Sequence, residues 1–109
     1  MIMQESPVIN KIQSLALKTM PKGSQVFLYG SRARGDYNAD SDWDLLILVD
    51  KENISNSDHD KYAYPFTYLG WEMGIPISPI LYSKKQWASY NFTPFHKNVE
   101  QDQICLYES

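Results

Sequence analysis

Residues 25–50 of the chain read QVFLYGSRARGDYNADSDWDLLILVD, and the arrangement of the sheet is inferred from this segment. It contains two runs of strand-forming residues, 25–29 and 42–50, separated by a small, basic and polar connection. Alternate residues of a strand point to opposite faces. In the second run one face holds Asp44, Leu46 and Leu48, and the other holds Trp43, Leu45, Ile47 and Val49. Both faces are apolar beyond Asp44, so we expect a central strand covered on both sides.

A helix is expected before the first of these strands. Ser6 is a typical capping residue, and Pro7 suits the first helical position. Apolar residues near helical spacing follow, namely Val8, Ile12, Leu15, Leu17 and Met20. Pro21 and Gly23 then end the helix.

A second helix and a third strand are expected after the central strand. Residues 61–73 are long enough for a helix, which Pro65 would break or kink. Residues 75–82 are typical of a strand, but Pro76 and Pro79 lack backbone donors. This third strand is therefore predicted to lie at an edge of the sheet or to carry a bulge.

The remaining segments complete the order of elements. Residues 51–60 are polar and loop-like, Ser83 suits the cap of a short helix, and Thr93-Pro94 suits the start of a last helix that runs to Val99. A short apolar tail follows at residues 104–107. The order helix, strand, strand, helix, strand, helix predicts an α/β or α+β layer fold with a small mixed sheet.

Composition narrows the class of protein. With 109 residues, 43% of them hydrophobic, we expect one domain, over residues 1–109, with a real core. The single Cys105 fits a reducing cytoplasm. No apolar run approaches the roughly 18 residues that cross a bilayer, and residues 1–10 lack the features of a signal peptide. The net charge of −3 is unfavourable for direct binding to nucleic acid. We therefore expect a cytoplasmic protein that acts on neither membrane nor nucleic acid.

Two short motifs carry candidate chemistry. Gly30-Ser31 follows a strand and begins a helical turn, where backbone amides and the serine hydroxyl favour an anion such as phosphate. Taken alone, such a pair is usually only a turn. Asp42 and Asp44 project from the same face at the start of a buried strand. Two close carboxylates repel each other unless a cation lies between them, and Mg²⁺ favours one or two carboxylates together with phosphate oxygens.

The spacing joins the two motifs. In a hairpin-like connection the end of the first strand and the start of the second are neighbours. A phosphate cradle at Gly30 and Ser31 would then meet a metal site at Asp42 and Asp44. This arrangement suits metal-dependent nucleotidyl transfer, with Asp42 and Asp44 as catalytic metal ligands.

These residues resemble a known signature. Gly30-Ser31, Arg32-Ala33-Arg34-Gly35 and Ser41-Asp42-Trp43-Asp44-Leu45 resemble the motif of the polymerase-beta-type nucleotidyltransferase superfamily, in particular its minimal, HEPN-associated and antitoxin-like branch. The resemblance implies a nucleotidyltransferase-like mixed sheet flanked by helices. It also implies one or two Mg²⁺ ions, an NTP substrate with ATP favoured, and transfer of AMP to a hydroxyl group. The implied acceptor is a partner protein, such as a HEPN-domain toxin.

One position departs from the family pattern. Active members carry a third carboxylate on the next strand, and the corresponding position here holds Ser78. A serine hydroxyl does not accept the proton of the attacking group as a carboxylate does. Glu72 precedes this strand, but its spacing alone does not place it near the pair. Two functions stay open: a working transferase, or a weak or inactive module that neutralises a toxin by contact.

Other residues have two interpretations. Arg32 and Arg34 are either solvated charges on a turn or phosphate contacts, and Arg32 is the better candidate because it lies closer to Ser31. His59 and His96 lack partners at ligand spacing, so we expect surface positions for them. A dense set of aromatic residues suits a core or a partner interface better than base stacking, namely Tyr62, Tyr64, Phe66, Tyr68 and Trp71.

Overall fold

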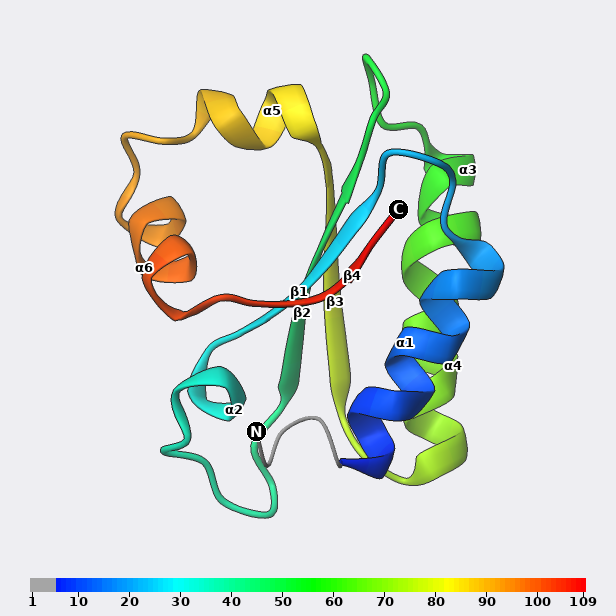
Figure 1. Cartoon of the computed structure of the whole chain (residues 1–109), viewed down its shortest axis with the longest axis vertical. Helices are drawn as coiled ribbons and strands as arrows, with labels where there is room; N and C mark the ends of the chain where they lie inside the picture. Colours follow the sequence, from blue (N-terminus) through cyan, green and yellow to red (C-terminus); the bar gives the residue numbers. More distant parts are fainter. Residues whose placement is uncertain (1–5) are drawn as a thin grey trace.

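A computed structural model describes residues 6–109 as a four-stranded mixed sheet between two layers of helices. In chain order the elements are α1 (Pro7–Thr19), β1 (Gln25–Tyr29), α2 (Ser31–Arg34), β2 (Trp43–Val49), α3 (Asn56–Asp58), η2 (His59–Ala63), α4 (Tyr64–Met73), β3 (Ile77–Ser83), α5 (Lys84–Ser89), α6 (Pro94–Asp102) and β4 (Ile104–Glu108). Figure 1 shows α1 and α4 on one face of the sheet, and α5 and α6 on the other. The short helix α2 follows the end of β1, and its Ala33 packs against the core on the α1 and α4 side. The predicted fold class, a small mixed sheet flanked by helices, is confirmed.

The strand order β3-β2-β1-β4 places β2 inside the sheet, as its sequence predicts. Trp43 and the odd-numbered residues after it join the core beneath α1 and α4, whereas Leu46 and Leu48 join Phe27, Trp87 and Val99 on the other face. The register pairs β1 with β2 in antiparallel fashion and β2 with β3 in parallel fashion. Both faces of β2 are thus covered, except where Asp44 interrupts the apolar pattern.

Helix α1 has the predicted start, with the Ser6 side chain accepting a hydrogen bond from the Ile9 amide at 3.4 Å. Its buried face consists of Ile9, Ile12 and Ala16. The prediction that Leu17 belongs to this face is wrong, since 72% of Leu17 is exposed. Ala16 takes that place because it lies four residues, about one turn, after Ile12.

The segment before α4 is more ordered than its polar sequence suggests. Residues 56–58 form α3 and residues 59–63 form a π-helical turn, so the loop predicted for 51–60 is wrong in its second half. Helix α4 then begins at Tyr64, with Pro65 in its first turn. The helix predicted for 61–73 is thus interrupted just before Pro65, as expected: residues up to Ala63 are π-helical, and the regular α-helix begins at Tyr64, where proline is tolerated in the first turn.

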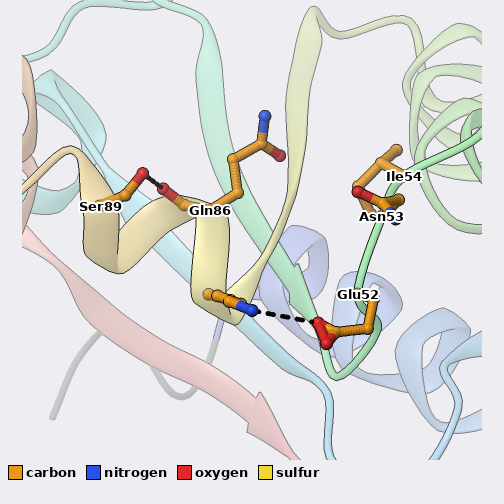
Figure 2. A pocket seen from close by; sticks show the side chains of 6 residues that line it. Glu52, Asn53, Ile54, Gln86 and Ser89 are labelled. Carbon is orange, nitrogen blue, oxygen red and sulfur yellow. Dashed lines mark hydrogen bonds and ion pairs between the residues drawn. The ribbon is translucent and has the colours of Figure 1, made fainter.

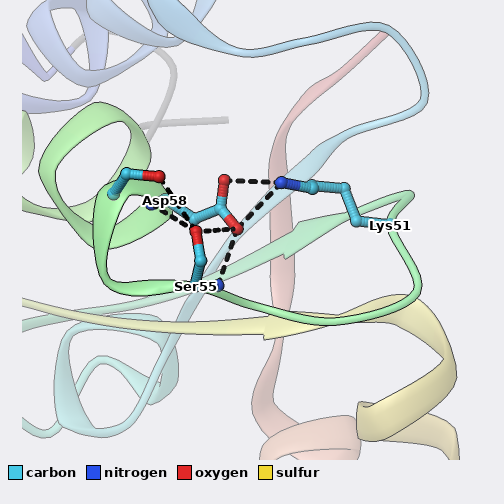
Figure 3. Close-up of polar contacts among 4 residues, drawn as sticks. Lys51, Ser55 and Asp58 are labelled. Carbon is cyan, nitrogen blue, oxygen red and sulfur yellow. Dashed lines mark hydrogen bonds and ion pairs between the residues drawn. The ribbon is translucent and has the colours of Figure 1, made fainter.

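A buried carboxylate explains this order. Asp58 is 1% exposed, and its two carboxylate oxygens accept hydrogen bonds from Lys51 Nζ at 2.7 and 2.9 Å. The Ser55 amide and hydroxyl donate to the same carboxylate at 2.8 and 3.1 Å (Figure 3). These donors lower the pKa of Asp58 to about 2, with the Lys51 hydrogen bond as the largest cause.

The two edges of the sheet are protected in different ways. β3 is an edge strand, as its prolines predict. Trp43 N donates to Pro76 O at 2.9 Å, so strand alternation turns the Pro79 nitrogen outward, where the ladder needs no donor. The tail at residues 104–107 pairs with β1 as strand β4, which sequence reasoning missed. Leu106 forms a bulge there, and its carbonyl accepts a hydrogen bond from the Gln13 side chain at 3.0 Å.

Two further observations concern single elements. His96 is 4% exposed and stacks on Trp87 with ring centroids 4.4 Å apart, so its predicted surface position is wrong.

Within residues 6–109, no helix is long and apolar enough to cross a membrane.

The Asp58 cluster predicts a pH-dependent stability. A carboxylate whose pKa is lowered on folding stabilises the protein above its unfolded pKa, here 3.8, and loses this contribution as the pH falls through about 2. We expect Asp58→Asn to lower the free energy of unfolding at pH 7. The difference from wild type should shrink between about pH 4 and pH 2. Urea unfolding across this pH range measures it, with Asp60→Asn as the exposed control. An equal effect of both substitutions would contradict the role of the cluster.

Candidate functional site

The hairpin between β1 and β2 brings the glycine-serine turn against the aspartate pair. Tyr29, the last residue of β1, pairs with Asp44 of β2. The next residue, Gly30, has φ +78° and ψ −158°, a backbone conformation that residues other than glycine rarely adopt. A Cβ atom at Gly30 would lie 2.5 Å from Asp44 Oδ2. The Gly30 backbone therefore packs directly beside the Asp44 carboxylate, and the predicted meeting of the two motifs is confirmed.

The turn presents backbone donors at this place. The Gly30 carbonyl accepts hydrogen bonds from the Ala33 and Arg34 amides at 3.1 and 3.0 Å. The amides of Ser31 and Arg32 begin the short helix α2, where the first amides have no intrahelical acceptor. Together with the Ser31 hydroxyl, they are groups that can bind the oxygens of an anion.

The two aspartates lie close enough to affect each other. Asp42 is exposed just before β2, and Asp44 is half-buried within it. Burial, followed by repulsion from Asp42, raises the pKa of Asp44, whereas Arg34 opposes this shift. Two carboxylates that repel each other beside a row of donors form a site for a cation with bound anion oxygens. Among residues 6–109, no group of three or more His, Cys, Asp and Glu side chains gathers. The chemistry of the Asp42–Asp44 pair fits Mg²⁺, which takes one or two carboxylates and completes its shell with phosphate oxygens and water.

Ser78 completes the pair on the neighbouring strand. The parallel register places Ser78 opposite Asp44, and its hydroxyl donates to Asp42 Oδ2 at 3.2 Å. Glu72 does not take part. It belongs to α4 on the other face of the sheet, where it lines a groove together with Lys11 and Lys18.

Each of the two arginines binds protein groups. Arg32 donates to the carbonyls of Ala39 and Ser41 at 3.2–3.3 Å. Arg34 forms ion pairs with Asp36 at 3.2 Å and with Asp102 at 2.8 Å, which ties α2 to the end of α6. The phosphate role of Arg32 stays a prediction, and the Asp102 contact lies too far away in sequence for spacing to suggest it.

Tyr29 is a member of this site that sequence reasoning missed. Burial is the main cause that raises the pKa of Tyr29 to about 12, and the nearby Asp44 adds to it. Its ring meets Phe95 edge-to-face at 5.8 Å. Tyr29 therefore stays neutral and forms an aromatic wall beside the carboxylates. Its position at the end of β1, next to the glycine turn, was the available signal.

A separate cavity lies away from the glycine turn and the aspartate pair. A cavity of about 670 Å³ lies between the residues that follow β2 and helix α5 (Figure 2). Its rim carries an ion pair between Lys85 and Glu52 at 3.4 Å, and none of the predicted site residues lines it. Asp42 precedes β2 and Glu52 follows it, so the cavity lies at the opposite end of this strand. It has no part in the chemistry described above.

Comparison with known proteins identifies relatives of this arrangement. The family model described as "Nucleotidyltransferase domain" matches residues 11–103. A candidate protein adenylyltransferase of Methanocaldococcus jannaschii is 33% identical over 104 residues, which is 95% of this chain and 98% of that protein. The residues matched by the family model include the glycine turn and the aspartate pair.

Solved structures share the fold. A crystal structure of a toxin–antitoxin with AMP-PNP has a TM-score of 0.63 at 18% identity, over 93% of this chain and 73% of the matched chain. A complex of tri-AMPylated Shewanella oneidensis HEPN toxin with MNT antitoxin has a TM-score of 0.56 at 16% identity, over 94% and 71%. At these identities the likeness concerns the fold alone.

The close packing at Gly30 predicts that Gly30→Ala destabilises the fold more than Gly35→Ala does. Gly30→Ala introduces both an unfavourable conformation and a clash with Asp44, so we expect it to lower the free energy of unfolding by about 1–3 kcal/mol. Gly35→Ala is the matched control, since Gly35 has φ +92° but nothing within 4 Å of its added Cβ. Its cost should be smaller. Chemical denaturation measures both, and equal costs would contradict the close approach of Gly30 to Asp44.

Proposed function

The chain belongs to the nucleotidyltransferase domain family, and on that premise we propose that it transfers AMP from ATP to a hydroxyl group of a partner protein. We propose that residues 1–109 act as one such domain. The observation that carries the proposal is the contact between the Gly30 backbone and the Asp44 carboxylate. It joins donors for phosphate to a pair of ligands for a divalent cation.

The side chains have distinct roles in this proposal. Asp42 and Asp44 would hold one or two Mg²⁺ ions, and Ser31 with the first amides of α2 would hold the phosphates of ATP. When bound, Mg²⁺ would neutralise the negative charge that develops at the α-phosphate of ATP and on the pyrophosphate that leaves as the acceptor oxygen bonds to the α-phosphorus. Gly30 lets the phosphates approach the backbone, and Tyr29 keeps one side of the site apolar. The acceptor hydroxyl approaches from the open side, where Asp42 is exposed.

The acceptor is proposed from relatives and from the shape of the site. A relative that matches 95% of this chain is a candidate protein adenylyltransferase, and a structure of the same fold holds an AMPylated HEPN toxin. The aspartates lie at the surface end of β2 rather than in an enclosed cavity, which suits a hydroxyl presented by another protein. A HEPN-domain toxin is therefore the proposed partner.

Titration calorimetry with ATP tests the site. We expect wild type to bind ATP in the presence of Mg²⁺, and Asp42→Asn/Asp44→Asn to lose at least tenfold in affinity because the cation loses both ligands. Asp40→Asn, an exposed aspartate of the same loop, is the control for removal of charge. Equal ATP binding by wild type and the double variant would reject the proposal.

Ser78 favours a second candidate function, that of a module which neutralises its partner by contact. Its hydroxyl stands beside Asp42, and the resemblance to the family implies that this position corresponds to the third carboxylate. In this second function nucleotide binding persists without transfer. Neutralisation of the toxin by the Asp42→Asn/Asp44→Asn variant would favour contact over chemistry.

A matched pair of substitutions at Ser78 separates these functions. Ser78→Asp adds a group that accepts the proton of the attacking hydroxyl, whereas Ser78→Asn has the same shape without the charge. General-base catalysis contributes about 10²–10⁴-fold, so we expect Ser78→Asp to raise the rate of AMP transfer from labelled ATP by about 10²-fold. Ser78→Asn should leave the rate unchanged or lower. The same rate in both variants would show that a base at this position does not limit transfer.

A further inference from the structure

We propose that Arg32 is a positioning residue, which sets the place of Asp42 by holding the residues on both sides of it. This inference rests on the proposed function, in which Asp42 is a metal ligand. It differs from the direct phosphate contact that the sequence suggests for Arg32. The evidence is the set of contacts that its guanidinium group makes.

The first contacts hold the chain just before Asp42. Arg32 Nε and Nη2 both donate to the Ser41 carbonyl, at 3.3 and 3.2 Å, and Nη2 also donates to the Ala39 carbonyl at 3.3 Å. The Ser41 carbonyl belongs to the peptide group that leads into Asp42. These bonds therefore fix that peptide relative to α2.

The second contacts are with two aromatic rings, one before Asp42 in the sequence and one directly after it. The guanidinium carbon lies 4.6 Å from the centroid of the Trp43 ring and 4.4 Å from that of Tyr37. Trp43 is 7% exposed and anchored in the core, while Tyr37 is 49% exposed on the loop. Arg32 thus links the exposed Tyr37 of the loop to the buried Trp43 at the start of β2. Stacking on an aromatic face and a planar fork of donors are properties of arginine that lysine lacks.

Asp42 depends on such support because its own contacts are few. Within residues 6–109, the side-chain hydrogen bond to Asp42 comes from Ser78 at 3.2 Å. The preceding loop closes mainly on itself, through Asn38 and Ser41. Arg32 adds the connection from this loop to the phosphate-binding turn. One side chain thus sets the distance between the phosphate donors of α2 and the metal ligand Asp42.

The test separates cation binding from phosphate binding. ATP binding is titrated by calorimetry against Mg²⁺ concentration and again in EDTA, for wild type, Arg32→Lys and Tyr37→Leu. Residues that orient metal ligands typically change metal affinity by 10–100-fold. We therefore expect both variants to need about tenfold more Mg²⁺ for half-maximal ATP binding, with ATP binding in EDTA and the melting temperature close to wild type. The double variant should be no worse than either single one, because the two residues act as one unit.

Tyr64→Leu is the control for loss of an exposed tyrosine, since Tyr64 is 46% exposed at the start of α4. A loss of ATP affinity in EDTA with Arg32→Lys alone would make Arg32 a phosphate ligand and overturn the proposal. An unchanged Mg²⁺ requirement would also overturn it.

A second measurement does not depend on nucleotide. Amide hydrogen exchange of residues 39–43 should accelerate in Arg32→Lys and in Tyr37→Leu, because the loop loses its tether. Failure of wild type to bind ATP with Mg²⁺ would reject the proposed function, and the exchange rates would still decide whether Arg32 holds this loop. Unchanged exchange rates would overturn the positioning role.

Discussion

The contact between the Gly30 backbone and the Asp44 carboxylate is the constraint on which the rest of the site depends. It requires three features at once: a β1–β2 hairpin in the register that pairs Tyr29 with Asp44, a residue without Cβ at position 30, and a carboxylate at the start of a buried strand. A slip of one residue in this register would move Asp44 to the other face of the sheet, into the core beneath α1 and α4. The alternating apolar residues of β2 prevent this slip, because it would expose them. The packing of the core therefore also fixes the position of Asp44 beside Gly30.

The two faces of the sheet divide the work. Helices α1 and α4 cover one face of the sheet, and α5 and α6 cover the other (Figure 1). By strand alternation, Asp44 lies on the same face of β2 as Leu46 and Leu48, which pack with Trp87 of α5 and Val99 of α6. Electrostatic balance at this edge comes from groups far apart in sequence. Asp42 repels Asp44, Arg34 opposes that repulsion, and Asp102 holds Arg34 in place. The negative charge of the Asp42–Asp44 pair is only partly compensated by protein groups, and a divalent cation with bound phosphates would compensate the rest.

Several features that depend on residues close together in sequence were predicted correctly. The period of two in β2, the caps at Ser6, Ser83 and Thr93, and the edge position of the proline-containing β3 follow from the residues and their neighbours in sequence. Two errors arose where a partner in another element decides, and a third where a local ion pair and helix cap were overlooked. His96 is buried because Trp87 stacks on it, and the tail becomes β4 because β1 has a free edge. The segment around Asp58 is ordered because Lys51 and Ser55 bind its carboxylate.

By itself the sequence determined the mixed sheet, the hairpin that joins the glycine turn to the aspartate pair, and the family that this motif resembles. These features follow from side-chain period, turn chemistry and spacing, all of which act over a few residues. Only the tertiary structure decided that Ser78 donates to Asp42, that Glu72 lies on the wrong face, and that Arg32 grips the loop on both sides of Asp42. Such contacts depend on strand register and on which helix covers which face, because these bring residues together that no sequence spacing relates.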